Sequence, residues 1–187
     1  MDHPLRWLLA KLAFIFPGGA TVRPTLHRWR GVRIGRNVWI APYVYLDELY
    51  PEGVRIGDNC TIGLRTSIFS HFHWGSRPTS GGFKPVVIED DVFIGPHCVI
   101  LPGVLIGQGS VIKAGSVVTR NVPPGVFWSD AGGGPLMTAT VPLTPRYSYE
   151  EFVRGLRLLP SSRGAASRMT NRVAPSLEDA KVNEHRN

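Results

Sequence analysis

A six-residue period of aliphatic side chains constrains the fold of this chain more than any other feature. The period holds in three blocks separated by two breaks. Its positions are Ile34, Ile40 and Leu46, then Ile56, Ile62 and Ile68, then Ile88, Ile94, Ile100, Ile106, Ile112 and Val118. Two residues before each of them stands a small or β-branched residue, for example Val32 or Cys60. Alternation along a strand puts both positions on the same inward face.

Repeats of this length predict an all-β fold. Three six-residue units close one triangular coil, so the series predicts a parallel β-helix of about four stacked coils. A glycine or another small residue often follows the aliphatic one, and we expect the chain to turn its corners there. Cys60 and Cys98 occupy small inward positions in different units. They are expected to be buried free thiols on different faces rather than reactive cysteines.

Two insertions interrupt the repeat. The one after Leu46 adds four residues to a unit, and the one after Ile68 adds fourteen. Both follow the third unit of a coil, so both leave from the same corner on adjacent coils, and insertions in solenoids commonly gather on a functional face. The residues that open them are Asp47 and Glu48 in the shorter insertion and His71, His73 and Trp74, from the stretch SHFHWG, in the longer one.

The segments outside the repeat predict short helices and a tail. Residues 1–20 carry apolar side chains at helical spacing, which indicates an N-terminal amphipathic helix rather than a signal peptide. The β-helix is expected over 30–125, with an insertion loop at 70–85. A C-terminal extension over 126–160 is expected to contain a short helix at 148–159, capped by a serine. Residues 161–187 are polar and rich in small residues, which is typical of a disordered tail.

Charge and hydropathy exclude several classes of protein. The net charge of +7 favours anionic partners, but the basic residues are scattered and accompany no nucleic-acid-binding signature. We therefore expect no nucleic-acid partner. No apolar run in the sequence is long enough to span a bilayer. A cytoplasmic location is expected, and a peripheral membrane contact through the N-terminal helix stays open.

Three segments resemble the hexapeptide-repeat acyltransferases, which include maltose, galactoside and polysaccharide O-acetyltransferases. They are VRIGDNCTIG, VFIGPHCVILPGVLIGQGSVIKAGSVVTRNVPPG and the histidine-bearing loop between them. The resemblance implies a left-handed coil, whereas general chain physics favours right-handed crossovers. It also implies a homotrimer with active sites between subunits. The implied reaction transfers an acetyl group from acetyl-CoA to a sugar hydroxyl in bacterial surface or exopolysaccharide biosynthesis, without a metal.

The same resemblance implies a catalytic histidine. The family's general base lies fourteen residues beyond the asparagine of the IGDN motif, and from Asn59 this count reaches His73. His71 is the alternative, because Trp74 replaces the proline that usually follows the histidine. An imidazole that titrates at about pH 6.5 can take the proton of an attacking hydroxyl.

Three further residues are candidates for the acceptor side of the site. Asp47 and Glu48 would either fix the tautomer of the histidine or hold sugar hydroxyls. The simpler interpretation makes both of them solvated turn carboxylates. Trp74, next to the paired histidines, is the third candidate.

The segment IKAGSVVTRNVPP resembles the part of the family that contacts coenzyme A. Ala114, Thr119 and Arg120 take the positions of the contacting residues. Arg120 would meet a coenzyme A phosphate bidentately. Lys113 replaces a family glycine and either adds a second charge or is a solvated corner lysine.

Other interpretations stay open. The chain could be an N-acetyltransferase of an amino sugar, or a non-catalytic β-helix scaffold. A zinc hydratase similar to the γ-class carbonic anhydrases is a further alternative, for which His71, His73 and His97 supply the number of ligands without that family's spacing. We interpret His97 as a corner residue.

The outward positions on two faces predict the homotrimer independently of the resemblance. Two adjacent faces with this much apolar surface exceed what a soluble monomer usually exposes, and a closed ring would bury both. These positions are Trp39, Thr61, Phe93 and Val111 on the second face and Tyr45, Ser67, Val99 and Val117 on the third.

Overall fold

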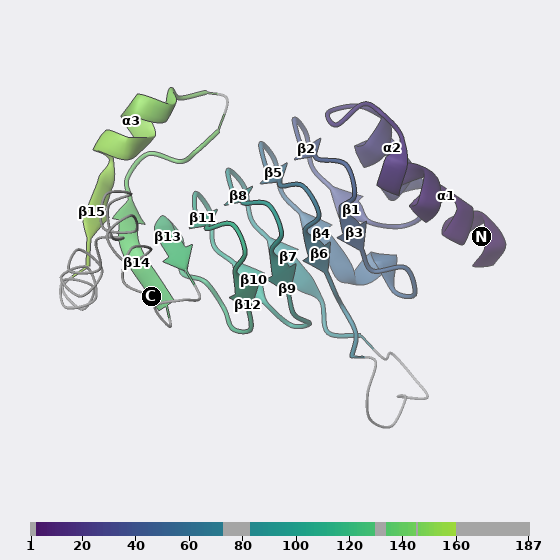
Figure 1. Ribbon diagram of the computed structural model, residues 1–187. Coiled ribbons are helices and arrows are strands. Elements are labelled where there is room, and N and C mark those ends of the chain that lie inside the picture. Colours follow the sequence, from purple (N-terminus) through teal and green to yellow (C-terminus); the bar gives the residue numbers. More distant parts are fainter. Residues whose placement is uncertain (1–2, 73–82, 130–133, 145, 160–187) are drawn as a thin grey trace, which may run out of the picture.

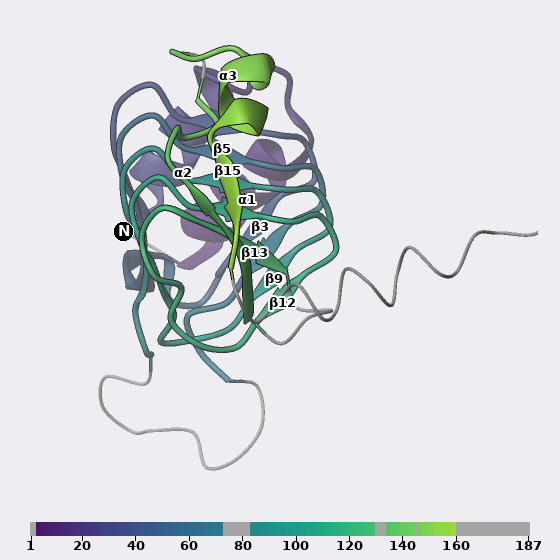
Figure 2. The same cartoon turned by 90° about the vertical axis from the view of Figure 1, so that its left-hand side faces the viewer.

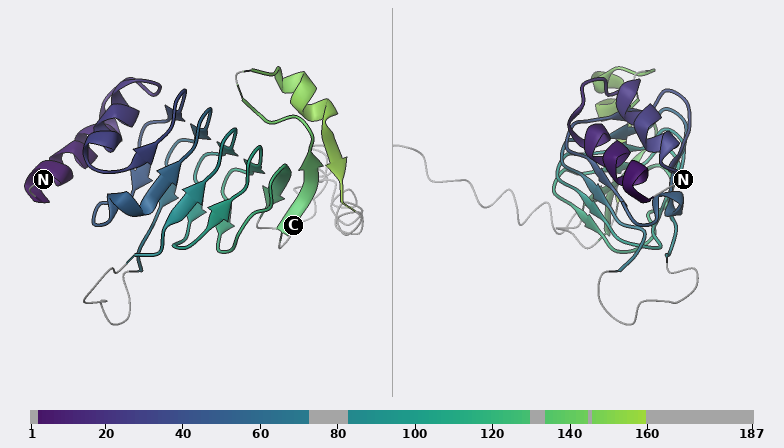
Figure 3. Two further views of the ribbon diagram at one scale, coloured as in Figure 1. Left: turned by 180° about the vertical axis from the view of Figure 1, so that it is seen from behind. Right: turned by 90° about the vertical axis from the view of Figure 1, so that its right-hand side faces the viewer.

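The chain folds as a left-handed parallel β-helix, as the sequence predicts. The computed structural model describes residues 3–72, 83–129, 134–144 and 146–159. Helices cover one end of the stacked coils, and a C-terminal extension covers the other end (Figure 1). The view from behind shows the same two ends in Figure 3. None of the helices in these residues is both long and apolar enough to cross a bilayer.

Strands of successive coils stack in parallel into three faces. Face 1 contains β1 (Arg33–Ile34), β4 (Val54–Ile56), β7 (Val86–Ile88) and β10 (Leu105–Ile106). Face 2 contains β2 (Trp39–Ile40), β5 (Thr61–Ile62), β8 (Phe93–Ile94) and β11 (Val111–Ile112). Face 3 contains β3 (Tyr45–Leu46), β6 (Ser67–Ile68), β9 (Val99–Ile100) and β12 (Val117–Val118). Seen along the stack, the coils lie nearly on top of one another (Figure 2).

The interior is filled by the aliphatic ladder. Parallel register stacks Ile40 on Ile62 and Ile62 on Ile94, and all three side chains have 0% exposure. Cys60 and Cys98 are buried free thiols that enter faces 2 and 3, which confirms the expectation for both. Their Sγ atoms lie 3.0 Å and 3.2 Å from main-chain carbonyl oxygens of the next coil, so each weak donor is satisfied without a disulfide.

The corners use glycine for a different reason from the expected one. Positive φ angles occur immediately before the small inward residue, at Asn37, Asn59 and Asp91 in one corner. The glycine after the aliphatic residue instead allows close stacking of coils. At Gly63, a Cβ atom would lie 2.5 Å from the main chain of Gly95, closer than van der Waals contact permits. The glycines that follow the aliphatic residues therefore indicate where coils touch, whereas the turns with positive φ lie just before the small inward residues and use Asn, Asp, glycine and other residues.

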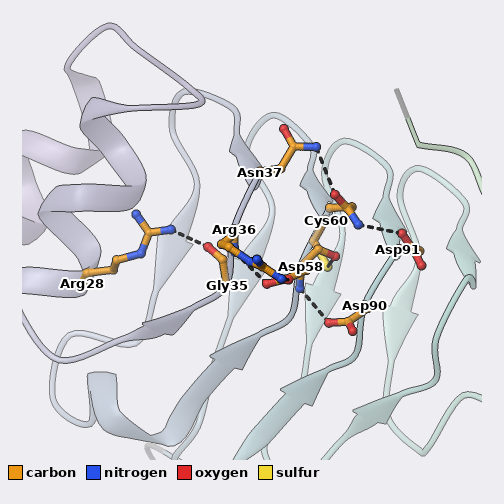
Figure 4. Close-up of polar contacts among 9 residues, drawn as sticks. Arg28, Gly35, Arg36, Asn37, Asp58, Cys60, Asp90 and Asp91 are labelled. Atoms are coloured by element: carbon orange, nitrogen blue, oxygen red, sulfur yellow. Dashed lines mark hydrogen bonds and ion pairs between the residues drawn. The ribbon is translucent and has the colours of Figure 1, made fainter. Parts of the chain in front are cut away.

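Polar side chains form a ladder along that corner (Figure 4). Nδ2 of Asn37 donates to Oδ1 of Asn59 at 3.1 Å, and Nδ2 of Asn59 donates to Oδ1 of Asp91 at 3.0 Å. Between the same two coils as the second of these bonds, the main-chain N–H of Asp58 donates to the carboxylate of Asp90 at 2.7 Å. These bonds satisfy corner groups that the strand ladders leave unpaired.

Two helices, rather than the one predicted, cover the N-terminal end. They are α1 (His3–Ile15) and α2 (Val22–Trp29), which pack together through Leu9, Ala13 and Leu26. The sequence VRPTLHRW has too few apolar residues to show a helical period, so α2 is missed. The pair supplies main-chain carbonyls to the first coil, where Gly19 and Phe14 accept from the N–H groups of Ile40 and Tyr43.

The C-terminal extension continues face 2. Strand β13 (Val126–Ser129) pairs in parallel with β11, and β14 (Gly134–Ala139) and β15 (Leu156–Leu158) follow in antiparallel order. Between β14 and β15 lies α3 (Tyr149–Arg154), which begins with a capping box formed by Ser148 and Glu151. The expected helix over 148–159 therefore ends early, because its last residues pair as a strand instead.

This extension corrects one premise of the trimer prediction. Phe152 and Ala139 pack on Val111, and Phe93 lies against the same cluster. The apolar surface in this part of face 2 is thus covered by the chain itself. On face 3, Val117 stays 38% exposed and Tyr45 half-buried. Among the outward positions of faces 2 and 3, the exposed apolar side chains are thus Val117 on face 3 and Trp39 in the first coil of face 2, which is 49% exposed.

Candidate active site

Both insertions start at one edge of face 3, where its strands end. Leu46 of β3 pairs with Ile68 of β6, so Asp47 and the segment after Ile68 leave from adjacent coils. The shorter insertion contains a turn of 3₁₀ helix at Pro51–Gly53. The prediction that the two insertions share a corner is confirmed.

A histidine and a carboxylate meet at this edge. Nδ1 of His71 lies 2.5 Å from Oδ2 of Asp47. Asp47 has 0% exposure and His71 has 6%. Tyr50 packs edge-on against the imidazole, with ring centroids 5.4 Å apart. Asp47 is therefore no solvated turn carboxylate, contrary to the simpler interpretation of the sequence.

Four main-chain and side-chain donors besides His71 surround the Asp47 carboxylate. Oδ1 accepts from the N–H groups of Leu49 and Tyr50, both at 3.0 Å. Oδ2 accepts from the N–H of Ser70 at 2.8 Å and lies 2.9 Å from the Ser70 hydroxyl. Burial alone would raise the pKa of Asp47, but the hydrogen bonds from Tyr50, His71 and Ser70 outweigh it and lower that pKa. Asp47 is thus a fixed anion at neutral pH.

The fixed anion determines which imidazole nitrogen can act as a base. A neutral histidine whose Nδ1 faces a carboxylate carries its proton on Nδ1, which leaves the basic lone pair on Nε2. The carboxylate also stabilises the imidazolium that forms when Nε2 takes a proton. The arrangement is suited to general-base chemistry.

The structure separates the other acceptor-side candidates. Oε1 of Glu48 accepts from Nζ of Lys11 in α1 at 2.9 Å, so this carboxylate is held by the N-terminal helix. His73 and Trp74 lie outside the described residues. The expected roles of these two residues therefore stay predictions.

The candidate coenzyme residues lie at both edges of face 3. Thr119 and Arg120 follow β12, at the edge that carries His71, and β12 lies two strands from β6, which corresponds to about 10 Å. The Arg120 guanidinium lies over the ring of Trp128, 5.5 Å from its centroid. Lys113 and Ala114 are exposed at the opposite edge, where the chain enters β12.

The structure does not bring His97 together with His71 within one chain. His97 occupies a corner with a φ of 58°, before β9 begins. His71 follows β6 at the other edge of face 3. The interpretation of His97 as a corner residue agrees with this position.

A groove with aromatic walls crosses the outside of face 3 beside the histidine segment. Its volume is about 570 Å³, in the range of small-molecule sites. Tyr45 and Phe69 pack together in it, with ring centroids 5.2 Å apart. The guanidinium of Arg65 lies 5.8 Å from the ring centroid of Tyr43. The residues that line the groove are Phe14, Tyr43, Tyr45, Arg65, Ser67 and Phe69.

Several residues of the site are not found by sequence reasoning. Ser70 and Tyr50 support Asp47, and Arg30 donates to the main chain at Leu46 and Asp47. An arginine in the segment HRWRG looks like any surface cation. The one signal was its position just before the first coil, and position alone indicates no partner.

The repeat itself matches known family models. Residues 85–120 match the family described as bacterial transferase hexapeptide (six repeats), and residues 53–70 match the hexapeptide repeat of succinyl-transferase. In these segments the chain is similar to the hexapeptide-repeat transferases. The matched ranges flank the loop that carries the candidate histidines, so the family's coils frame the site.

Two curated members of the hexapeptide-repeat family show the extent of the similarity. YvoF of Bacillus subtilis is 37% identical over 105 residues, which cover 56% of this chain and 58% of YvoF. Galactoside O-acetyltransferase of Escherichia coli is 33% identical over 132 residues, which cover 59% of this chain and 65% of that enzyme. The chain thus spans less than two thirds of the length of either relative.

A solved structure of the hexapeptide-repeat family supports the fold. The hexapeptide-repeat containing acetyltransferase VCA0836 from Vibrio cholerae aligns with a TM-score of 0.50 and 28% identity. The alignment covers 67% of this chain and 85% of that structure.

Proposed function

We propose that this chain is an acetyl-CoA-dependent O-acetyltransferase that acetylates a sugar hydroxyl, with His71 as general base. The observation that carries the proposal is the 2.5 Å contact between His71 Nδ1 and the buried Asp47 carboxylate. A buried histidine held by a fixed anion is the arrangement that proton abstraction from a hydroxyl requires. Asp47 would orient His71 rather than contact the acceptor.

The proposed reaction is a direct transfer. Nε2 of His71 removes the proton of the acceptor hydroxyl as its oxygen attacks the thioester carbonyl carbon of acetyl-CoA. The carbon–sulfur bond then breaks, and the imidazolium returns the proton to the departing coenzyme A thiolate. Atoms and charge balance without a metal, and Asp47 stabilises the imidazolium between the two proton transfers.

The edge of face 3 supports acetyl-CoA as the donor. Thr119 and Arg120 lie on the edge that carries His71, about two strand spacings away. A guanidinium can bind a coenzyme phosphate bidentately. The similar proteins from Escherichia coli and Vibrio cholerae are both named acetyltransferases.

The aromatic groove supports a saccharide as the acceptor. Rings such as Tyr45 and Phe69 offer flat apolar surfaces to the faces of a sugar ring, and Ser67 adds a hydroxyl between them. The name of the Escherichia coli relative also specifies a galactoside. We further propose that the acceptor belongs to bacterial surface or exopolysaccharide biosynthesis, as the resemblance of the sequence implies.

A homotrimer would complete the site. Lys113 and Ala114 lie at the edge of face 3 opposite His71, so one chain does not place them beside its own histidine. A neighbouring copy packed on face 3 would bring its own Lys113 edge toward the His71 edge. The exposed Val117 and the half-buried Tyr45 and Val99 of face 3 support this assembly.

The experiment that tests the proposal is release of free thiol from acetyl-CoA across a panel of sugars and oligosaccharides. We expect release that depends on a hydroxyl-bearing acceptor and disappears in His71→Ala. Turnover with amino sugars alone would instead indicate an N-acetyltransferase. Absence of turnover with every acceptor, by the folded trimer, would favour a non-catalytic scaffold.

A further inference from the structure

Arg30 is a buried cation whose side chain is directed at the segment that carries Asp47. It ends α2 and has 1% exposure. Its Nη1 donates to the main-chain oxygen of Asp47 and its Nη2 to that of Leu46, both at 2.7 Å. Burial lowers the pKa of Arg30 to about 10, and the nearby carboxylates of Glu48 and Asp47 oppose this effect. Arg30 is therefore still charged at neutral pH.

The third bond of the guanidinium ends on a second buried histidine. Nε of Arg30 donates to Nδ1 of His27 at 2.9 Å. Burial, and then the charges of Arg30 and Arg23, hold the pKa of His27 well below its ordinary value. His27 is thus neutral and accepts through Nδ1. This bond fixes the guanidinium plane from the side opposite to Asp47.

Asp47 is held through its main chain and its side chain at once. Its N–H donates to the carbonyl of Ile68 at 3.0 Å, and its own carbonyl accepts from Arg30. Both peptide planes beside the Asp47 side chain are therefore anchored. These anchors fix the main chain from which the Asp47 side chain starts, and the donors of Leu49, Tyr50 and Ser70 then hold the carboxylate beside His71.

We propose that Arg30 is a positioning residue for the His71 base, acting through the main chain of Asp47. This inference rests on the proposed function and extends it to the N-terminal helices. They are then part of the catalytic apparatus, because α2 supplies the group that aligns Asp47. The burial cost of a guanidinium is offset by hydrogen bonds to its nitrogens, and here Nε, Nη1 and Nη2 each donate one.

A purely structural role for Arg30 is the competing explanation, and the chain offers a matched control. Arg23 also lies in α2, is 5% exposed, and donates to main-chain carbonyls, those of Ile40 and Phe16, both at 2.7 Å. Its bonds attach the same helix to face 2 and to the end of α1. Loss of Arg23 therefore removes a buried arginine without touching the Asp47 segment.

The test compares Arg30→Met with Arg23→Met in the full chain. We expect both to lower the Tm, but only Arg30→Met to lower kcat, by about 10–100-fold, as for other residues that orient a reactive histidine. The KM for acetyl-CoA should stay within about twofold, because the lost interaction acts in the transition state. Arg30→Lys should recover only part of kcat, since one ammonium cannot reach two carbonyls and His27 together.

A spectroscopic readout separates this inference from the proposed function. In the wild type, the imidazole ¹⁵N signals of His71 should show a protonated Nδ1. Arg30→Met should weaken that signature and Arg23→Met should preserve it, even if no acceptor supports turnover. If Arg30→Met does not fold, Arg30→Lys takes its place in both measurements. Wild-type kcat and an unchanged His71 signature in the Arg30 variant, or equal losses in the Arg23 variant, would overturn the inference.

Discussion

His71 and Asp47 form a hydrogen-bonded pair although 24 residues separate them in the chain. They meet because β3 and β6 are adjacent strands of one face, and each residue belongs to the insertion that leaves its own strand. The repeat thus converts a long sequence separation into a contact between neighbouring coils.

Replacing His71 by alanine should lower acetyl transfer by about 10²–10⁴-fold, the usual contribution of a general base. His73→Ala, measured beside it, distinguishes the two histidines of the loop. The Tm of both variants, measured alongside, shows whether each remains folded. An inactive His73 variant beside an active His71 variant would assign the base to His73.

Asp47→Asn should lower kcat by about 10²–10⁴-fold, because the amide removes the charge that stabilises the imidazolium. The matched control is Asp58→Asn, a half-buried corner carboxyl whose pKa is likewise lowered, by hydrogen bonds from Arg36. Equal kcat in wild type and Asp47→Asn would show that His71 acts without its carboxylate.

The same variant should change how stability depends on pH. Folding lowers the pKa of Asp47, so its ionised form stabilises the native state above the unfolded pKa of about 3.9. This contribution is lost as the pH falls through the lower folded pKa. The Tm difference between wild type and Asp47→Asn should therefore be largest at neutral pH and shrink below about pH 4. A constant difference across that range would contradict the bonding of the carboxylate.

Arg120→Ala should raise the KM for acetyl-CoA by about tenfold or more with little change in kcat. A hydrogen bond to a charged phosphate is worth about 1.5–3 kcal/mol, and the phosphate is remote from the reacting carbonyl. Arg120→Lys keeps the charge but not the bidentate geometry, so its KM for acetyl-CoA should lie between those of the wild type and Arg120→Ala. Measurement of the Tm controls for the lost contact with Trp128. An unchanged KM removes Arg120 from the coenzyme site.

Two residues of the last regular coil, similar in exposure but on different faces, can test the homotrimer prediction. Val117 on face 3 is 38% exposed, and Leu105 on face 1 is 37% exposed. Light scattering should report a trimer for the wild type and for Leu105→Arg, but smaller species for Val117→Arg. A wild-type monomer with full transferase activity would refute both the trimer and a site shared between subunits.

The regular part of the fold could be predicted almost completely from sequence. The period of the isoleucines is a local signal, and it specifies strand positions, inward faces and the shared corner of the insertions at once. The period does not indicate which carboxylate pairs with His71. Asp47 and Glu48 are adjacent acidic residues, and only the fold shows that one is buried against His71 while the other pairs with Lys11.

The contacts of Arg30 could not be predicted from the sequence for a related reason. Its partners are main-chain carbonyls, which every residue carries, so no side-chain motif records the contact. Helix α2 could not be predicted from the sequence, because its stability comes from packing on α1 and the first coil rather than from its own apolar period. Local patterns therefore describe the coils well and the ends of the coils poorly.

The two cysteines should be inert in the folded protein. Burial raises the pKa of Cys60 to about 12 and also raises the pKa of Cys98, so neither forms appreciable thiolate at pH 8. A thiol-reactive dye should titrate close to zero groups in the native protein and two after denaturation. Rapid labelling of either cysteine would contradict its position in the core. The inert thiols also leave the coenzyme A thiol as the signal in the release assay.

The carbonyls of Phe14 and Gly19 have a consequence for how separate molecules behave in solution. A parallel β-helix is open at each end, and its first coil could otherwise accept the last coil of another copy as a further turn. Because the N-terminal helices already occupy the N–H groups of Tyr43 and Ile40, that head-to-tail addition is blocked. The helices thereby set the length of the stack at one chain and protect it from growing into a fibre.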